Sequence, residues 1–195
     1  VDTGRLSDLI DNILESSKSD PKSMQLQFTT VDIVAFLRET IEHHKRLFED
    51  KHCEVKLNME TQPKVSMDMR AIRMVFNNLI VNALRYSSAG SSLTIQVQQD
   101  EDFCNIDFID QGFGFDKKDL RRVFKKFYRV QNQETQNIEG AGLGLYISQQ
   151  IVKSHKGKIS ASSEGRGKGA CFTVSLPLAT SLSETRPEET TEEGN

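Results

Sequence analysis

Apolar residues recur at helical spacing in four segments of the chain, which predicts four amphipathic helices. The first covers residues 1–20. The second covers residues 33–48 and follows Asp32, whose side chain suits a helix N-cap. The third, over residues 71–86, has the most regular apolar face, and the fourth covers residues 143–155.

Apolar and polar residues alternate in shorter segments, as is typical of strands with one buried face. Strands are predicted at residues 55–59, 93–97, 104–109, 158–162 and 171–176, with a further short strand beginning at Val65. A polar turn joins the second to the third strand, and a glycine-rich turn joins the last two. Two hairpins are therefore expected. The polar segment before the last helix, residues 130–142, predicts a mobile loop.

These elements divide the chain into three parts. One α/β domain is expected over residues 21–177. The regular apolar stripe of residues 1–20 indicates the end of a longer helix that packs against a partner helix. Residues 178–195 are rich in Ser, Thr and Glu and lack apolar periodicity, so we expect a disordered acidic tail.

Charge and composition exclude several classes of protein. The 195 residues include 25 Lys and Arg and 28 Asp and Glu, a net charge of −3, of which the tail contributes −4. The nearly neutral body argues against nucleic-acid binding. No apolar run approaches the roughly 20 residues of a membrane span, and no signal peptide opens the chain, so no membrane contact is expected. Cys53, Cys104 and Cys171 fit reduced thiols in a cytoplasmic protein and give no zinc-binding spacing.

Two amides lie on one face of the third predicted helix. Asn78 and Asn82 are four residues apart, and Arg85 and Tyr86 follow about one turn later. An amide oxygen is a hard ligand that suits Mg²⁺, which takes its remaining ligands from water and phosphates. Arg85 could meet a phosphate and Tyr86 a nucleoside. When this motif stands alone, capping of nearby backbone by the two amides is the alternative interpretation.

Two glycine motifs follow in the sequence. Asp110-Gln111-Gly112-Phe113-Gly114 ends a strand, where the carboxylate could accept a hydrogen bond from the amine of adenine while the glycines admit the base. Residues 140–145, Gly-Ala-Gly-Leu-Gly-Leu, open the last helix, where exposed amides can bind an anion. Each motif alone is weak evidence for a function. Together they indicate a nucleotide site, because the chain carries in order a helix with two amides, an acceptor for a base, a loop and a phosphate site.

This order of motifs resembles the catalytic and ATP-binding domain of sensor histidine kinases, in the gyrase, Hsp90, histidine kinase and MutL superfamily. The matching segments are the N box at residues 78–87, the first glycine box at 110–114, the F box at 124–129, the second glycine box at 140–144, and residues 155–157 and 172–177. The resemblance implies a Bergerat-type fold, an α+β two-layer sandwich with a mixed sheet backed by three helices. Residues 1–20 resemble the end of a dimerisation and phosphoacceptor hairpin.

The resemblance also implies roles for individual residues. Asn82 would hold Mg²⁺, with Asn78 supporting the metal and phosphates. Arg85 and Arg129 would contact phosphate, so Asn78, Asn82 and Arg85 are the expected catalytic residues. Tyr86 would line the pocket and Asp110 would bind the adenine amine. The pocket and its lid would be shaped by Gly112, Gly114, Gly140, Gly142, Leu143 and Gly144.

The type of residue at position 78 distinguishes a kinase from a hydrolase in this superfamily. ATPase relatives carry a Glu there as the base that activates water, whereas Asn78 cannot accept a proton, which favours phosphoryl transfer to another nucleophile. None of His43, His44, His52 and His155 precedes an acidic residue as the family's acceptor does, and His43, His44 and His155 are expected to be exposed. We therefore expect the acceptor histidine on a hairpin outside this chain, in a homodimeric protein that passes the phosphoryl group to a response regulator.

Two positions depart from the family pattern. Ala141 and Ala170 replace hydroxyl residues common in the family, and the loss of a hydroxyl at residue 170 could weaken adenine binding by about 0.5–1.5 kcal/mol. Two alternatives to a histidine kinase stay open. One is a degenerate module that binds nucleotide or a partner without phosphoryl transfer, and the other is a serine kinase of the anti-sigma type.

Overall fold

The computed structural model describes residues 26–130, 135–136, 138 and 140–180. The helix predicted at residues 1–20, residues 131–134, 137 and 139 of the predicted loop at 130–142, and residues 181–195 lie outside the described residues. Within the described part of the chain, no helix has the length and apolar character needed to cross a membrane.

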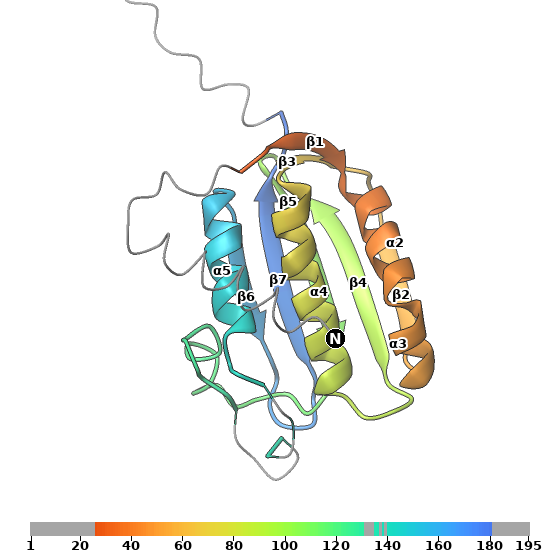
Figure 1. The fold of residues 1–195 in the computed structure, drawn as a ribbon, viewed down its shortest axis with the longest axis vertical. Coiled ribbons are helices and arrows are strands. Elements are labelled where there is room, and N and C mark those ends of the chain that lie inside the picture. The colour runs from red at the N-terminus through yellow and green to blue at the C-terminus, as the bar shows by residue number, and fades with distance from the viewer. Residues whose placement is uncertain (1–25, 131–134, 137, 139, 181–195) are drawn as a thin grey trace, which may run out of the picture.

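Five strands form one mixed sheet, as expected (Figure 1). Their order is β2 (Glu54–Met59), β4 (Ser92–Gln99), β5 (Phe103–Asp110), β7 (Ala170–Pro177) and β6 (Lys158–Ser162). The β4–β5 and β6–β7 pairs are antiparallel, which confirms both predicted hairpins. The β2–β4 pair is parallel and therefore needs a crossover connection, which the helix α4 (Met69–Arg85) supplies.

Helices cover one face of this sheet (Figure 1). They are α2 (Ile33–His43), the short α3 (Lys45–Asp50), α4 and α5 (Gly144–Ser154). Asp32 caps α2 as predicted, since its carboxylate accepts hydrogen bonds from the backbone N–H groups of Val34 and Ala35. The expected α/β sandwich with a mixed sheet backed by helices is confirmed.

The predicted helix over residues 33–48 is interrupted at His44. The Nδ1 atom of His44 bonds to the carbonyl of Thr40 at 2.9 Å, while the backbone N–H of His44 donates to Ile41 instead. The carbonyl of Thr40 thus pairs with the ring of His44 and not with its backbone N–H. His44 is buried, so the prediction that it is exposed was wrong, whereas His43 is exposed as expected.

A second, two-stranded sheet pairs β1 (Thr29–Asp32) with β3 (Lys64–Met67) in antiparallel register. The short strand predicted to begin at Val65 is confirmed as β3, whereas β1 was missed. Only Val31 is apolar in β1, so its sequence shows no recognisable alternation. The structured domain also extends past residue 177, because Leu178 is 8% exposed and bonds to the carbonyl of Asp102.

The inward-facing residues of the central strand β5 end in a charged side chain. Cys104, Ile106 and Phe108 are buried beneath the helices, and the rings of Phe76 on α4 and Phe108 lie 5.4 Å apart. Asp110 occupies the next inward position and is also buried. The alternation that builds the core therefore places a carboxylate at the rim of the same layer.

His155 joins the end of α5 to the start of α4, and its predicted exposure was also wrong. Its side chain is only 2% exposed. The backbone N–H of Asp68 donates to Nε2 of His155 at 3.0 Å, so the ring proton lies on Nδ1, which donates to the carbonyl of Ile151 at 2.7 Å. These two bonds require a neutral imidazole.

Burial lowers the pKa of His155 below its ordinary value. As the pH falls below about 6.5, the unfolded chain therefore takes up a proton before the folded one, and stability is lost. We predict that the unfolding free energy of the native protein, relative to that of His155→Gln, decreases between pH 7.5 and pH 5.5. Urea unfolding at both values measures this difference. His43→Gln is the exposed control, and an unchanged difference for His155→Gln would contradict the assignment.

Candidate functional site

The two amides of α4 lie against the start of α5. Nδ2 of Asn82 approaches Oδ1 of Asn78 at 3.5 Å, and Nδ2 of Asn78 donates to Oγ of Ser148 at 3.0 Å. A Cβ atom at Gly144 would lie only 2.2 Å from Oδ1 of Asn78, so the glycine leaves room for the amide in this position. The structure thus brings the first and third motifs together, as predicted.

Ser148 was not identified from the sequence. It is buried on α5 beside Ile147 and Ile151, and its hydroxyl accepts the hydrogen bond that fixes the amide of Asn78. A small hydroxyl residue within an otherwise apolar helix face was the available signal. Its position four residues after Gly144 places both residues on the side of α5 that meets α4.

The end of α4 contacts both glycine segments. A Cβ atom placed at Gly140 would lie 3.2 Å from Nη1 of Arg85. Tyr86 is the C-cap of α4, and its carbonyl accepts a hydrogen bond from the backbone N–H of Phe113 at 2.8 Å. Arg85 and Tyr86 therefore stand between the amides of α4 and the two glycine motifs.

Asp110 is buried and is fixed by two backbone hydrogen bonds. Its side chain is 9% exposed, and its Oδ1 atom accepts hydrogen bonds from the N–H groups of Gly112 at 2.8 Å and Ala170 at 3.1 Å. Burial raises the pKa of Asp110 to about 6, although both hydrogen bonds favour the carboxylate. At pH 7 the group is thus mostly ionised. Both described bonds use Oδ1, which leaves Oδ2 to meet a donor from a ligand.

The β6–β7 turn holds the first glycine motif in place, which the sequence patterns did not predict. The N–H groups of Gly167 and Gly169 donate to the carbonyls of Phe113 and Gly112 at 2.7 and 3.0 Å. Gly114 has φ +58°, and a Cβ atom there would lie 2.3 Å from the carbonyl oxygen of Gly165. The backbone of one loop therefore fixes the backbone of the other.

Ser163 stabilises the junction of these two loops. Its hydroxyl oxygen accepts hydrogen bonds from the N–H groups of Phe115 and Gly165, and it lies 2.7 Å from the carbonyl oxygen of Gly169. A half-buried serine directly after β6 gives little sequence signal, because its role depends on Gly169, six residues later, and on Phe115, 48 residues earlier.

The F-box segment packs on the second glycine motif. The N–H of Phe127 donates to the carbonyl of Gly142 at 3.0 Å, and a Cβ atom at Gly142, where φ is +71°, would lie 2.8 Å from the backbone of Phe127. Leu143 is the N-cap of α5 and no side chain caps this helix, so its first N–H groups can receive an anion.

Arg129 lies beside the lid segment. Its Nη2 atom donates to the carbonyl of Ile138, and its Nε atom is buried with no hydrogen-bond partner in the described part of the chain. The structure therefore pairs this predicted phosphate-binding residue with the backbone of Ile138. Its buried Nε–H is available as a donor.

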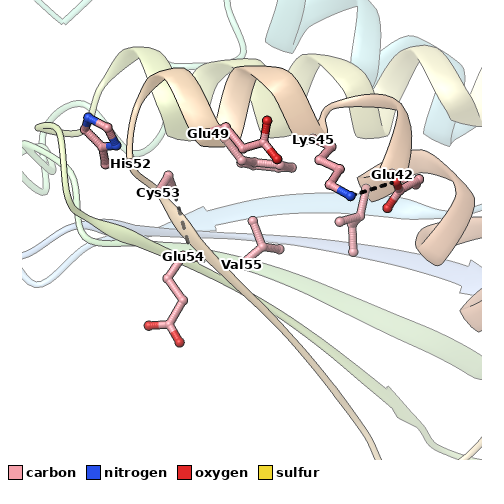
Figure 2. A pocket seen from close by; sticks show the side chains of 9 residues that line it. Glu42, Lys45, Glu49, His52, Cys53, Glu54 and Val55 are labelled. Carbon is pink, nitrogen blue, oxygen red and sulfur yellow. Dashed lines mark hydrogen bonds and ion pairs between the residues drawn. The ribbon is translucent and has the colours of Figure 1, made fainter.

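Of two surface cavities, one is lined by a residue of the motifs and the other is not. A cavity of about 390 Å³ flanks the end of α4 and is lined by Leu47, Lys51, Val81, Leu84, Arg85 and Ile138. A larger one of about 590 Å³ lies between α3 and β2 (Figure 2). Its lining includes His52, Cys53 and Glu54 but no residue of the three motifs, so its size does not make it the candidate site.

The geometry described above defines a site with two chemically different ends. One end offers a buried carboxylate beside glycine backbone, which suits the amine of a flat base. The other end offers two amides, Arg85 and the uncapped start of α5, which suit phosphates and a hard cation. A nucleotide has this same order of groups.

Comparisons with known proteins agree with this architecture. Residues 67–180 match the family described as histidine kinase-, DNA gyrase B-, and HSP90-like ATPase. The sensor histidine kinase WalK of Bacillus subtilis (strain 168) is 36% identical over 179 residues, which are 90% of this chain and 29% of WalK. The chain therefore spans less than a third of that relative's length.

Two solved structures share the fold. Full-length ShkA in complex with AMPPNP has a TM-score of 0.72 at 21% identity, over 89% of this chain and 36% of that one. Histidine kinase ThkA in complex with the response regulator protein TrrA has a TM-score of 0.70 at 22% identity, over 89% and 47%.

The fold and the matched motifs define an ATP-binding domain of the Bergerat type. The chain belongs to the histidine kinase-, DNA gyrase B- and HSP90-like ATPase family, and it is similar to sensor histidine kinases such as WalK, which matches 90% of the chain.

The buried carboxylate of Asp110 is expected to cost stability. Its pKa lies about two units above the ordinary value, so Asp110→Asn should stabilise the ligand-free protein at pH 7 by up to about 3 kcal/mol. The gain should vanish as the pH falls from 6 to 4, because the native side chain then becomes neutral in the folded state. Thermal and urea unfolding across this range measure it. Asp107→Asn, on the opposite face of β5, is the control, and a pH-independent gain would contradict the assignment.

Proposed function

We propose that this domain binds Mg-ATP and transfers the γ-phosphoryl group to a histidine on a dimerisation hairpin. The acceptor histidine would lie outside this chain, in the same or the paired protomer of a homodimer. A response regulator would then receive the phosphoryl group, a partner class supported by the ThkA–TrrA complex. Since ATP is a cytoplasmic substrate, the domain would work in the cytoplasm, whether or not its parent protein is anchored in a membrane.

The donor chemistry of the site fits this ligand. Asp110 would accept the adenine amine through Oδ2, and Gly112 and Gly114 would let the base approach the backbone. The Nδ2 atom of Asn82 is directed to Asn78, which leaves the Oδ1 atom of Asn82 for a hard cation. Magnesium, when bound through Asn82 and the phosphates, would neutralise charge on the transferring group.

The remaining site residues would hold the triphosphate. Arg85 and the first N–H groups of α5, at Leu143 and Gly144, would bind its oxygens, with Gly140 and Gly142 letting the lid close on them. Arg129 would use its free Nε donor there. Tyr86 would line the nucleoside pocket. These roles position the phosphoryl group and exclude water from it, and none of them requires a protein base.

The environment of Asn78 is the observation that carries the proposal. Its amide is fixed by Ser148 and faces Asn82 and Gly144, at the position where a hydrolase would need a carboxylate base. An amide there can orient the metal ligand but cannot activate water. The site therefore supports transfer to a strong external nucleophile over hydrolysis.

Asn82→Ala should abolish the Mg²⁺-dependent part of ATP binding, because it removes the proposed protein ligand of the metal. Titration calorimetry with ATP in Mg²⁺ and in EDTA measures this part. Asn77→Ala removes the same amide from a different face of α4 and should bind as the native chain does. Retention of the full magnesium dependence in Asn82→Ala would refute the metal assignment.

Phosphoryl transfer itself is tested with the full-length protein and γ-labelled Mg-ATP. A label on histidine that is acid-labile and stable in base is expected, together with its passage to a receiver domain. Bound nucleotide without any labelled protein would instead indicate a non-catalytic module. An acid-stable label on a partner's serine would indicate a serine kinase.

A further inference from the structure

Ser87 carries a buried hydroxyl that the fold leaves unsatisfied. Its side chain is 6% exposed and follows directly on the C-cap of α4. Its Oγ atom has no hydrogen-bond partner, a condition that, within the described residues, only Nε of Arg129 shares among buried side-chain nitrogen and oxygen atoms. Native proteins keep few such atoms, and a water or a ligand group is the usual explanation.

The hydroxyl is directed at the base end of the site. A Cβ atom at Gly112 would lie 2.9 Å from Oγ of Ser87 and 2.8 Å from Oδ1 of Asp110. The same point would lie 2.4 Å from the carbonyl oxygen of Tyr86, which already accepts a bond from Phe113. The absent side chain of Gly112 thus leaves Ser87 and Asp110 on one side of the same backbone position.

The two groups have complementary chemistry. The carboxylate of Asp110 only accepts hydrogen bonds, so it can bind the exocyclic amine of adenine but not N1 and N7, the ring nitrogens on either side of the amine. Those nitrogens need a donor. Of the two unsatisfied groups, Ser87 is the one beside Asp110, and a hydroxyl can donate directly or through one water.

We propose that Ser87 is a specificity-determining residue for adenine, which donates to the ring nitrogen beside the amine bound by Asp110. The inference rests on the proposed function, since it requires adenine at Asp110. The residue at position 170 supplies no side-chain donor to adenine, so the hydroxyl of Ser87 matters more. Ala170 pairs with Asp110 in the sheet register, so its side chain is on the same face, but it offers only its backbone N–H, which Asp110 already uses.

Calorimetry on the native chain, Ser87→Ala and Ser88→Ala would test this role, with ATP, 1-deaza-ATP and 7-deaza-ATP as ligands. Loss of one such hydrogen bond should weaken the binding of ATP to Ser87→Ala by about three- to tenfold. This penalty should vanish for one of the two deaza analogues, which lacks the accepting nitrogen, and persist for the other. Ser88 is exposed and adjacent, so Ser88→Ala should bind all three ligands as the native chain does.

Binding of ATP to Ser87→Ala as tightly as to the native chain would overturn the proposal. So would an equal loss for all three nucleotides, which is the signature of a structural role. The melting temperature separates the two roles further, because deletion of an unsatisfied hydroxyl should not lower it. Failure of the folded native chain to bind ATP at all would instead refute the proposed function.

Discussion

The site depends on the close approach of α4 and α5 at Asn78 and Gly144. Both helices pack on the same face of the sheet, and the absence of a Cβ atom at Gly144 leaves the space that the amide of Asn78 occupies. A side chain at residue 144 would displace this amide and break its bond to Ser148. The amide face of one helix and the N-terminal end of the other are therefore a single geometric unit.

A second constraint comes from the sheet. Asp110 continues the inward-facing stripe of β5, so the alternation that builds the core also buries a carboxylate. Two backbone N–H groups stabilise its charge, but its raised pKa shows that desolvation exceeds their effect. The protein thus keeps an ionised acceptor at a cost in folding free energy. A ligand amine can recover part of that cost, which makes binding and stability interdependent at this position.

Sequence patterns predicted the elements with strong periodicity and the motifs whose residues are unusual for their place. The amides in the apolar helix α4, the Asp at the end of β5 and the glycines before α5 all gave such signals. Contacts between distant loops gave none: Ser163 and the β6–β7 turn act on the first glycine motif through backbone bonds. The burial of His44 and His155 was also missed, because each histidine is satisfied by a backbone carbonyl that sequence spacing does not reveal.

On the proposed function, the amide at residue 78 would affect metal binding as well as the choice between kinase and hydrolase. With Asn78 and Asn82 both neutral, α4 presents oxygen ligands without negative charge, so on the proposed function most of the attraction for Mg²⁺ must come from the triphosphate. The cation would then enter and leave with the nucleotide rather than reside in the empty site. A carboxylate at residue 78 would both attract the metal alone and supply a base for water. On the proposed function, a neutral amide at residue 78, fixed by Ser148, would therefore prevent both the binding of Mg²⁺ without nucleotide and the activation of water.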